Sequence, residues 1–150
     1  MMAVMTDVGG LDRACDDMSA EEPTTELFVN GTLMQGLALH ANLGDATFLG
    51  ETRTAPSYRL HSIDDVHPGM YWAADGSSIA GELYAVTAQQ RDYILATEPP
   101  GLYFGPVKLA DGRTTEGVLF SAVEASRYPD ITGFGGWRAY QAAIHRRTTA

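Results

Sequence analysis

Glu98 is the side chain in this sequence best placed to transfer a proton. It stands directly before Pro99-Pro100-Gly101, and the apolar residues 102–104 follow that loop. The prolines stiffen the backbone, and burial among apolar neighbours raises the pKa of a carboxyl group toward neutrality. A general acid or base needs such a pKa. We therefore predict Glu98 as a catalytic residue; the alternative is an exposed loop glutamate without a chemical role.

A second feature is the loop that follows the apolar run 27–29. Asn30-Gly31 ends this run, and the pattern predicts a strand, a tight turn and the start of a helix. Gly31 has no Cβ, so a ligand can approach its backbone closely. The N–H groups of Gly31, Thr32 and Leu33 at a helix N-terminus would hold a carboxylate. The alternative is an ordinary turn.

These residues resemble a known motif. Leu-Phe-Val-Asn-Gly-Thr-Leu-Met at 27–34 is similar to the opening of the γ-glutamyl cyclotransferase-like family, which usually has aromatic-Val-Tyr-Gly-Thr-Leu. Asn30 stands where the family has tyrosine. The resemblance extends over residues 27–103, and Glu98 followed by Tyr103 is similar to the family's glutamate and tyrosine.

This resemblance implies a cofactor-independent enzyme whose partner is a small-molecule substrate with a carboxylate. Asn30, Gly31, Thr32, Leu33 and Tyr103 would bind the substrate. Glu98 would move a proton from the α-amine of a γ-glutamyl amide to the departing amine. The products would be 5-oxoproline and a free amine.

The C-terminal half resembles a different family. The segments 52–60, 109–113 and 130–140, the last reading Asp-Ile-Thr-Gly-Phe-Gly-Gly-Trp-Arg-Ala-Tyr, are similar to the C-terminal domain of allophanate hydrolases. This second resemblance implies two alternatives: an enzyme that acts on a small carbamate or urea-derived acid, or a binding or assembly module without catalysis. Fold resemblance alone does not separate them.

The order of elements predicts an α+β domain, a small mixed β-barrel with flanking short helices. Helices are expected at 35–43, at 88–96 with Thr87 as N-cap, and near the C-terminus. Two hairpins are expected, one joining 70–73 to 79–86 and one joining 107–109 to 115–120, each through an Asp-Gly turn. The segment 64–69 is predicted to be a loop, and 46–51 and 57–61 to be strands.

Charge divides the chain into two parts. Residues 1–26 hold seven acids against Arg13, and the remainder holds twelve acids against nine bases, which together give the net charge of −9. We predict a disordered acidic segment at 1–25 and one folded domain at 26–145. Without a basic patch, nucleic acid and anionic membranes are excluded as expected partners.

Other sequence features bear on where the protein is located and on whether it binds a metal. No apolar run is long enough for a membrane helix, and the first residues lack a signal-peptide pattern, so we expect a cytoplasmic protein. Cys15 is the only cysteine, which rules out an intramolecular disulfide. His61 and His67 lack the spacing of a tetrahedral metal site, so we expect no metal and no cofactor. The oligomeric state is left open.

Two charged residues outside this site have open roles. Glu82 lies in an alternating strand, where it would face solvent or a pocket. Arg138 lies beside Trp137 and Tyr140, and we expect it to pack on the rings by cation–π contact; the alternative is a clamp for a substrate carboxylate.

Overall fold

The computed structural model describes residues 23–149, with side chains up to residue 145. Its strands are β2 (Thr24–Val29), β3 (Thr47–Arg53), β4 (Tyr58–Ile63), β5 (His67–Trp72), β6 (Ala80–Thr87), β7 (Tyr103–Lys108) and β8 (Thr114–Leu119). The α-helices are α2 (Ala88–Thr97), α3 (Ala122–Ala125) and α4 (Trp137–Thr149), and the 3₁₀ helices are η3 (His40–Leu43) and η4 (Thr132–Phe134). The predicted α+β class is confirmed.

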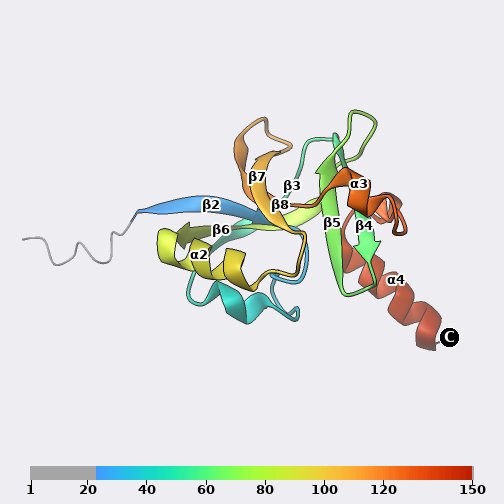
Figure 1. Ribbon diagram of the computed structural model, residues 1–150, viewed down its shortest axis with the longest axis horizontal. Coiled ribbons are helices and arrows are strands. Elements are labelled where there is room, and N and C mark those ends of the chain that lie inside the picture. The colour runs from blue at the N-terminus through green and yellow to red at the C-terminus, as the bar shows by residue number, and fades with distance from the viewer. Residues whose placement is uncertain (1–22, 150) are drawn as a thin grey trace, which may run out of the picture.

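The main sheet has five strands in the order β3-β6-β2-β8-β7. β2 lies at its centre, antiparallel to β6 and parallel to β8. This position explains the apolar run of β2, because a central strand is buried on both faces: Leu27, Phe28 and Val29 are each at most 1% exposed. Figure 1 shows α2 lying along this sheet.

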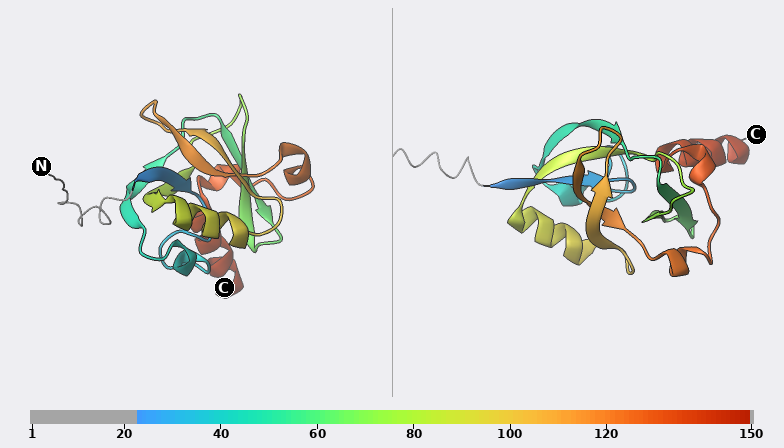
Figure 2. Two further views of the ribbon diagram at one scale, coloured as in Figure 1. Left: turned by 60° about the vertical axis from the view of Figure 1, so that its left-hand side comes forward. Right: turned by 90° about the horizontal axis from the view of Figure 1, so that it is seen from above.

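The sheet does not close into the predicted barrel. Its edge strands β3 and β7 meet only beyond one end, where Thr54 bridges to Leu109 and the amide of Ala55 donates to the carbonyl of Lys108. β4 and β5 form a separate two-stranded sheet beside the main one (Figure 2). The fold is therefore a curled open sheet with short helices, and the prediction of a closed barrel was wrong.

The predicted hairpin between 70–73 and 79–86 is also wrong, because β5 pairs with β4 instead of β6. The turn between β4 and β5 contains Asp64 and Asp65, which adopt φ angles of 57° and 58°. Aspartate tolerates this left-handed region better than most residues, so an Asp-Asp pair can make the reversal without glycine. Part of the predicted loop 64–69 thus belongs to β5. The predicted hairpin of β7 and β8 is confirmed.

The helix after β6 begins where the sequence predicts. Thr87 is its N-cap: the Thr87 hydroxyl accepts from the Gln90 amide at 3.1 Å, and the Gln90 side chain accepts from the Thr87 amide at 2.9 Å. This reciprocal pair satisfies two amides that the first turn of a helix otherwise leaves unpaired.

Thr87→Ala is expected to lower the free energy of unfolding by about 1 kcal/mol, the typical value of an N-cap hydroxyl. Urea denaturation followed by circular dichroism would measure it. Thr47→Ala is a control, because Thr47 is an exposed strand residue opposite Ala85 and caps no helix. An equal loss in both variants would contradict the capping role.

The helix predicted at 35–43 is reduced to the four residues of η3. Residues 31–39 form consecutive tight turns instead, with the Met34 amide donating to Gly31 O and the Leu37 amide donating to Met34 O. Gly36 has a φ of +78°, which lies outside the helical region and stops a helix from starting at Gln35. No helix dipole therefore supports the loop at 30–33.

The predicted boundary at residue 26 falls inside the sheet. β2 begins at Thr24, and the rest of the acidic segment predicted to be disordered lies outside the described residues. At the other end, α4 continues to Thr149, beyond the predicted domain end at 145. Among residues 23–149, no helix is long and apolar enough to cross a membrane.

Candidate functional site

Glu98 is positioned by the end of α2. It is the C-cap residue, with φ −69° and ψ 151°, and the following proline imposes these extended angles. The Leu102 amide then donates to the Pro99 carbonyl, which folds the Pro-Pro-Gly loop back toward the domain. The carboxyl group consequently turns inward at the point where the helix ends.

The environment of this carboxyl group is apolar enough to change its pKa. Its Oε2 atom is buried and has no hydrogen-bond partner among the described residues. Burial disfavours the charged form and raises the pKa of Glu98 from 4.5 to about 7. At neutral pH the group is therefore present in both protonation states, which suits a residue that accepts and returns a proton.

The structure brings Glu98 to the predicted loop. Residues 29–33 and Glu98 line one small cavity of about 10 Å³, together with His67, Pro68, Leu102 and Val118. Asn30 is 4% exposed, and its side-chain amide donates to the carbonyl of Val118 at 3.1 Å. Asn30 thus ties the end of β2 to β8 and fixes where the loop begins.

The loop is covered in this conformation. A Cβ built on Gly31 would lie 2.6 and 2.7 Å from Cδ and Cγ of Pro68, so the space expected for a ligand holds a proline ring. Gly31 is required because Pro68 approaches it. The remaining cavity has room for about one water molecule.

The backbone amides of the loop form no hydrogen bond within the described residues. Within residues 23–149, the N–H groups of Gly31, Thr32 and Leu33 donate to no protein acceptor. The carbonyls of Gly31 and Thr32, in contrast, accept from Met34 and Leu39. Gly31, Thr32 and Leu33 line the cavity beside Glu98, and unpaired backbone amides at such a place are chemically suited to a small carboxylate.

The lining of the cavity departs from the predicted site at two residues: Tyr103 was predicted and does not line it, and His67 lines it and was not predicted. Tyr103 is 48% exposed at the start of β7 and is absent from the lining of the cavity. His67 lines the cavity and is only 6% exposed; its Nδ1 lies 3.0 Å from the carbonyl of Pro68. From the sequence, His67 is only a poor metal ligand. No local pattern indicates that β5 pairs with β4, which places His67 in the same cavity as Asn30.

Glu82 and Arg138 form a second cluster, outside this cavity. Glu82 is 2% exposed, and its Oε1 accepts from the amide of Gln35 at 3.0 Å and from the hydroxyl of Tyr84 at 2.9 Å. Its Oε2 accepts from Arg138 at 3.0 Å, and the same Arg138 nitrogen donates to the carbonyl of Gln35. The ion pair thus clamps Gln35, two residues after the loop.

The expected cation–π contact of Arg138 is not formed. In the part of the chain with described side chains, the guanidinium that lies over a ring is that of Arg91, 5.1 Å from the centre of Phe104. Arg138 turns instead to the buried carboxylate of Glu82, whose charge attracts it more strongly than a ring does.

Comparison with known proteins supports both resemblances. The family model of the allophanate hydrolase C-terminal domain matches residues 25–142. The chain belongs to this family. Urea amidolyase from Saccharomyces cerevisiae is 32% identical over 138 residues, which is 84% of this chain and 8% of that protein.

Solved structures extend the comparison. The crystal structure of c4763, described as a uropathogenic E. coli-specific protein, is 40% identical with a TM-score of 0.77, and the match covers 79% of this chain and 96% of that one. An AIG2-like protein from Mus musculus is 23% identical with a TM-score of 0.56 over 73% of this chain and 86% of its own, so it shows the fold alone. The fold is γ-glutamyl cyclotransferase-like, as expected.

This allophanate hydrolase C-terminal domain spans a small part of the yeast urea amidolyase and nearly all of the E. coli protein. The domain is therefore enzyme-related, and in E. coli a similar domain makes up almost a whole chain.

Proposed function

We propose that this domain is an enzyme in which Glu98 transfers a proton to and from a small carboxylic acid held by the loop at residues 30–33. One observation supports the proposal most directly. Among the described residues, the buried Oε2 of Glu98 has no hydrogen-bond partner, the amides of Gly31, Thr32 and Leu33 donate to no acceptor, and all four residues line the same cavity. Proton transfer to and from a bound carboxylic acid needs a base and a group of donors that holds the carboxylate, both at the same cavity.

For a γ-glutamyl amide, the reaction is an internal transfer. The loop amides hold the α-carboxylate, and Glu98 takes a proton from the α-amine as its nitrogen attacks the γ-carbonyl carbon. A new C–N bond closes the five-membered ring, the original amide C–N bond breaks, and Glu98 returns the proton to the departing amine. Nucleophile and electrophile belong to one molecule, so orientation supplies much of the rate.

A second candidate substrate is a small carbamate or urea-derived acid such as allophanate. Two observations favour it: membership of the allophanate hydrolase C-terminal family, and the narrow space that Pro68 leaves above Gly31. A smaller acid needs less movement of Pro68 than a γ-glutamyl amide does. The same residues would act in both cases.

A turnover screen tests the proposal. Purified protein is incubated with γ-glutamyl-alanine and, separately, with allophanate, and chromatography follows 5-oxoproline formation and loss of allophanate. Turnover of either compound that scales with protein concentration supports an enzyme and names the substrate class. Absence of turnover with both, across pH 5 to 9, would favour the binding or assembly module.

A further inference from the structure

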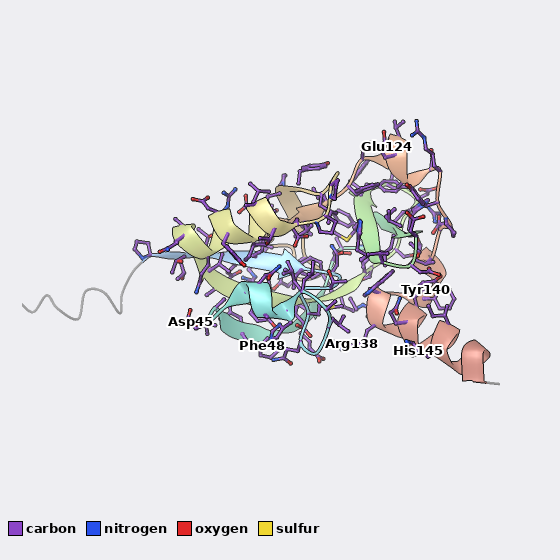
Figure 3. All side chains as sticks on the ribbon, turned by 60° about the horizontal axis from the view of Figure 1, so that its bottom comes forward. Asp45, Phe48, Glu124, Arg138, Tyr140 and His145 are labelled. Carbon is purple, nitrogen blue, oxygen red and sulfur yellow. The ribbon has the colours of Figure 1, made fainter. Side chains whose placement is uncertain are left out.

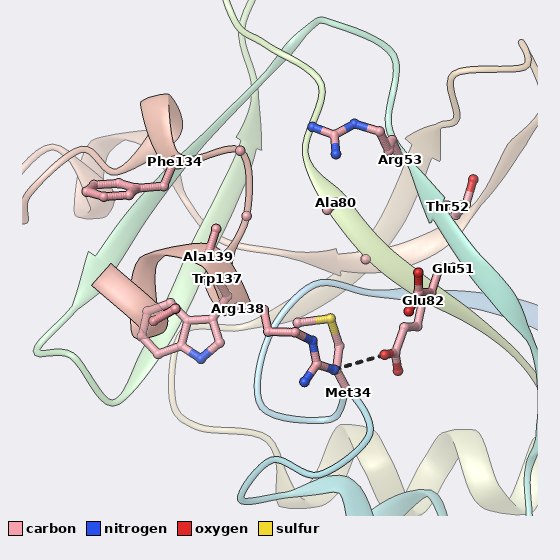
Figure 4. Close-up of a pocket in the computed structure, with 14 residues that line it drawn as sticks. Met34, Glu51, Thr52, Arg53, Ala80, Glu82, Phe134, Trp137, Arg138 and Ala139 are labelled. Carbon is pink, nitrogen blue, oxygen red and sulfur yellow. Dashed lines mark hydrogen bonds and ion pairs between the residues drawn. The ribbon is translucent and has the colours of Figure 1, made fainter. Parts of the chain in front are cut away.

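A large cleft lies outside the Glu98 cavity and shares no lining residue with it. We call it the α4 cleft. It has a volume of about 690 Å³, within the usual range of small-molecule sites. It is lined by Met34, residues 51–53 of β3, residues 80–82 of β6, residues 134–139 from the end of η4 to the first turn of α4, and Ala142 (Figure 4).

The surface of the α4 cleft is mainly apolar. Phe134 supplies the exposed large side chain, Trp137 and Met34 lie just beneath the surface at 3% exposure each, and glycine or alanine fills most of the remaining positions. Phe134 is 41% exposed, although an aromatic ring of this size is usually covered in a folded domain. A flat apolar group would find contact with both ring and backbone here.

Two arginines supply the polar contacts from opposite sides. Arg138 uses one nitrogen for Glu82 and Gln35, and its side chain is half exposed. Arg53 donates to Ser78 through Nε and Nη2, and its Nη1 makes no hydrogen bond to the described residues. Both guanidinium groups thus retain unused N–H donors, which match the oxygens of a carboxylate.

The α4 cleft also has two acidic residues, Glu82 and Glu51, and neither occupies the unused N–H groups of the arginines. Glu82 is buried, and its two oxygens already accept three hydrogen bonds. Glu51, its cross-strand partner, is exposed to solvent. The unused N–H donors of the cleft therefore belong to the two arginines, and Glu51 stands in solvent at the same cleft.

We propose that the α4 cleft binds a small carboxylate with a flat apolar body, held between Arg138 and Arg53 and packed against the exposed ring of Phe134. The site is separate from the proposed proton-transfer cavity. Because Arg138 also holds Gln35, a bound carboxylate would contact the residue that anchors the neighbouring loop.

Fluorescence of Trp137 tests the proposal. The chain has two tryptophans, and Trp72→Phe removes the other, which is 64% exposed. This protein is titrated with benzoate, benzamide and benzylamine, which share a ring and differ in charge. We expect saturable binding of benzoate at least about tenfold tighter than of benzamide, the usual effect of a charge-assisted hydrogen bond. Equal binding of the three, tighter binding of benzylamine, or no binding of benzoate would overturn the proposal.

Matched variants locate the site. Arg138→Gln and Arg53→Gln should each weaken benzoate binding by about tenfold, and the second variant leaves the clamp on Gln35 intact. Arg127→Gln is the control, since Arg127 pairs with Glu124, which lies across the molecule from Arg138 (Figure 3). Glu98→Gln should leave benzoate binding unchanged, so failure of the proposed turnover would not affect this result. Equal weakening by Arg127→Gln, or none by Arg53→Gln, would contradict the assignment.

Discussion

Replacing Glu98 with glutamine is expected to lower turnover of the substrate found in the screen by about 100-fold or more, the usual contribution of a positioned general acid or base. Glutamine keeps the size of the side chain but cannot accept and return a proton. The Michaelis constant should change far less, because in the proposed reaction the loop amides and not Glu98 hold the carboxylate. Steady-state kinetics of the two proteins would measure both quantities.

The control for this experiment is Glu124→Gln on α3. Glu124 is exposed, contacts Arg127 and does not line the cavity, so turnover should stay within twofold of the parent. Unchanged turnover in Glu98→Gln would remove Glu98 from the reaction. An equal loss in both variants would indicate a general effect on the protein.

The second large effect concerns stability. The pKa of Glu98 is raised in the folded protein, from 4.5 to about 7, so the folded state binds its proton more tightly than the unfolded state does. Its contribution to stability is complete below pH 4.5 and is lost as the pH rises through about 7. One pKa unit corresponds to about 1.4 kcal/mol, and partial solvent access reduces the total to roughly 2 to 3 kcal/mol.

Glu98→Gln carries no ionisable group at this position and should escape that loss. We expect the variant to gain about 2 to 3 kcal/mol relative to the parent between pH 4.5 and pH 8, measured by urea denaturation at a series of pH values. A constant difference between the two proteins over this range would mean that the carboxyl group has an ordinary pKa.

Local chemistry explains which parts of the fold were predictable. The capping pair Thr87 and Gln90, the end of α2 before Pro99, and the Asp-Gly turn of β7 and β8 depend on neighbours within a few residues. The position of Glu98 at the mouth of a rigid loop follows from the same local rules. These elements agree with their predictions closely.

Long-range pairing explains most of what was missed. The parallel contact of β2 with β8 joins residues almost 90 positions apart, and no local pattern encodes it. The reversal at Asp64 and Asp65 lacks glycine, so β4 and β5 were not recognised as a hairpin. The place of Pro68 over Gly31 follows from that hairpin, and with it the small size of the cavity.

The α4 cleft was missed for a related reason. The sequence shows Arg138 next to two aromatic residues, which favours a cation–π contact. Only the folded chain places Glu82 of β6 within 3.0 Å of that guanidinium. The buried Glu82, which lies far from Arg138 in the sequence, therefore determines what Arg138 contacts, and the neighbouring aromatic residues do not.

The proton-transfer role of Glu98 is tested most directly by the titration of its carboxyl group. Carbon-13 NMR of protein labelled at the glutamate side-chain carbonyl follows each carboxyl group with pH, and Glu98→Gln identifies the signal of Glu98. We expect a midpoint of about 7 for this signal. A midpoint near the ordinary 4.5 would contradict this role, because Glu98 would then be a solvated carboxylate and not the proton-transfer group of a buried site.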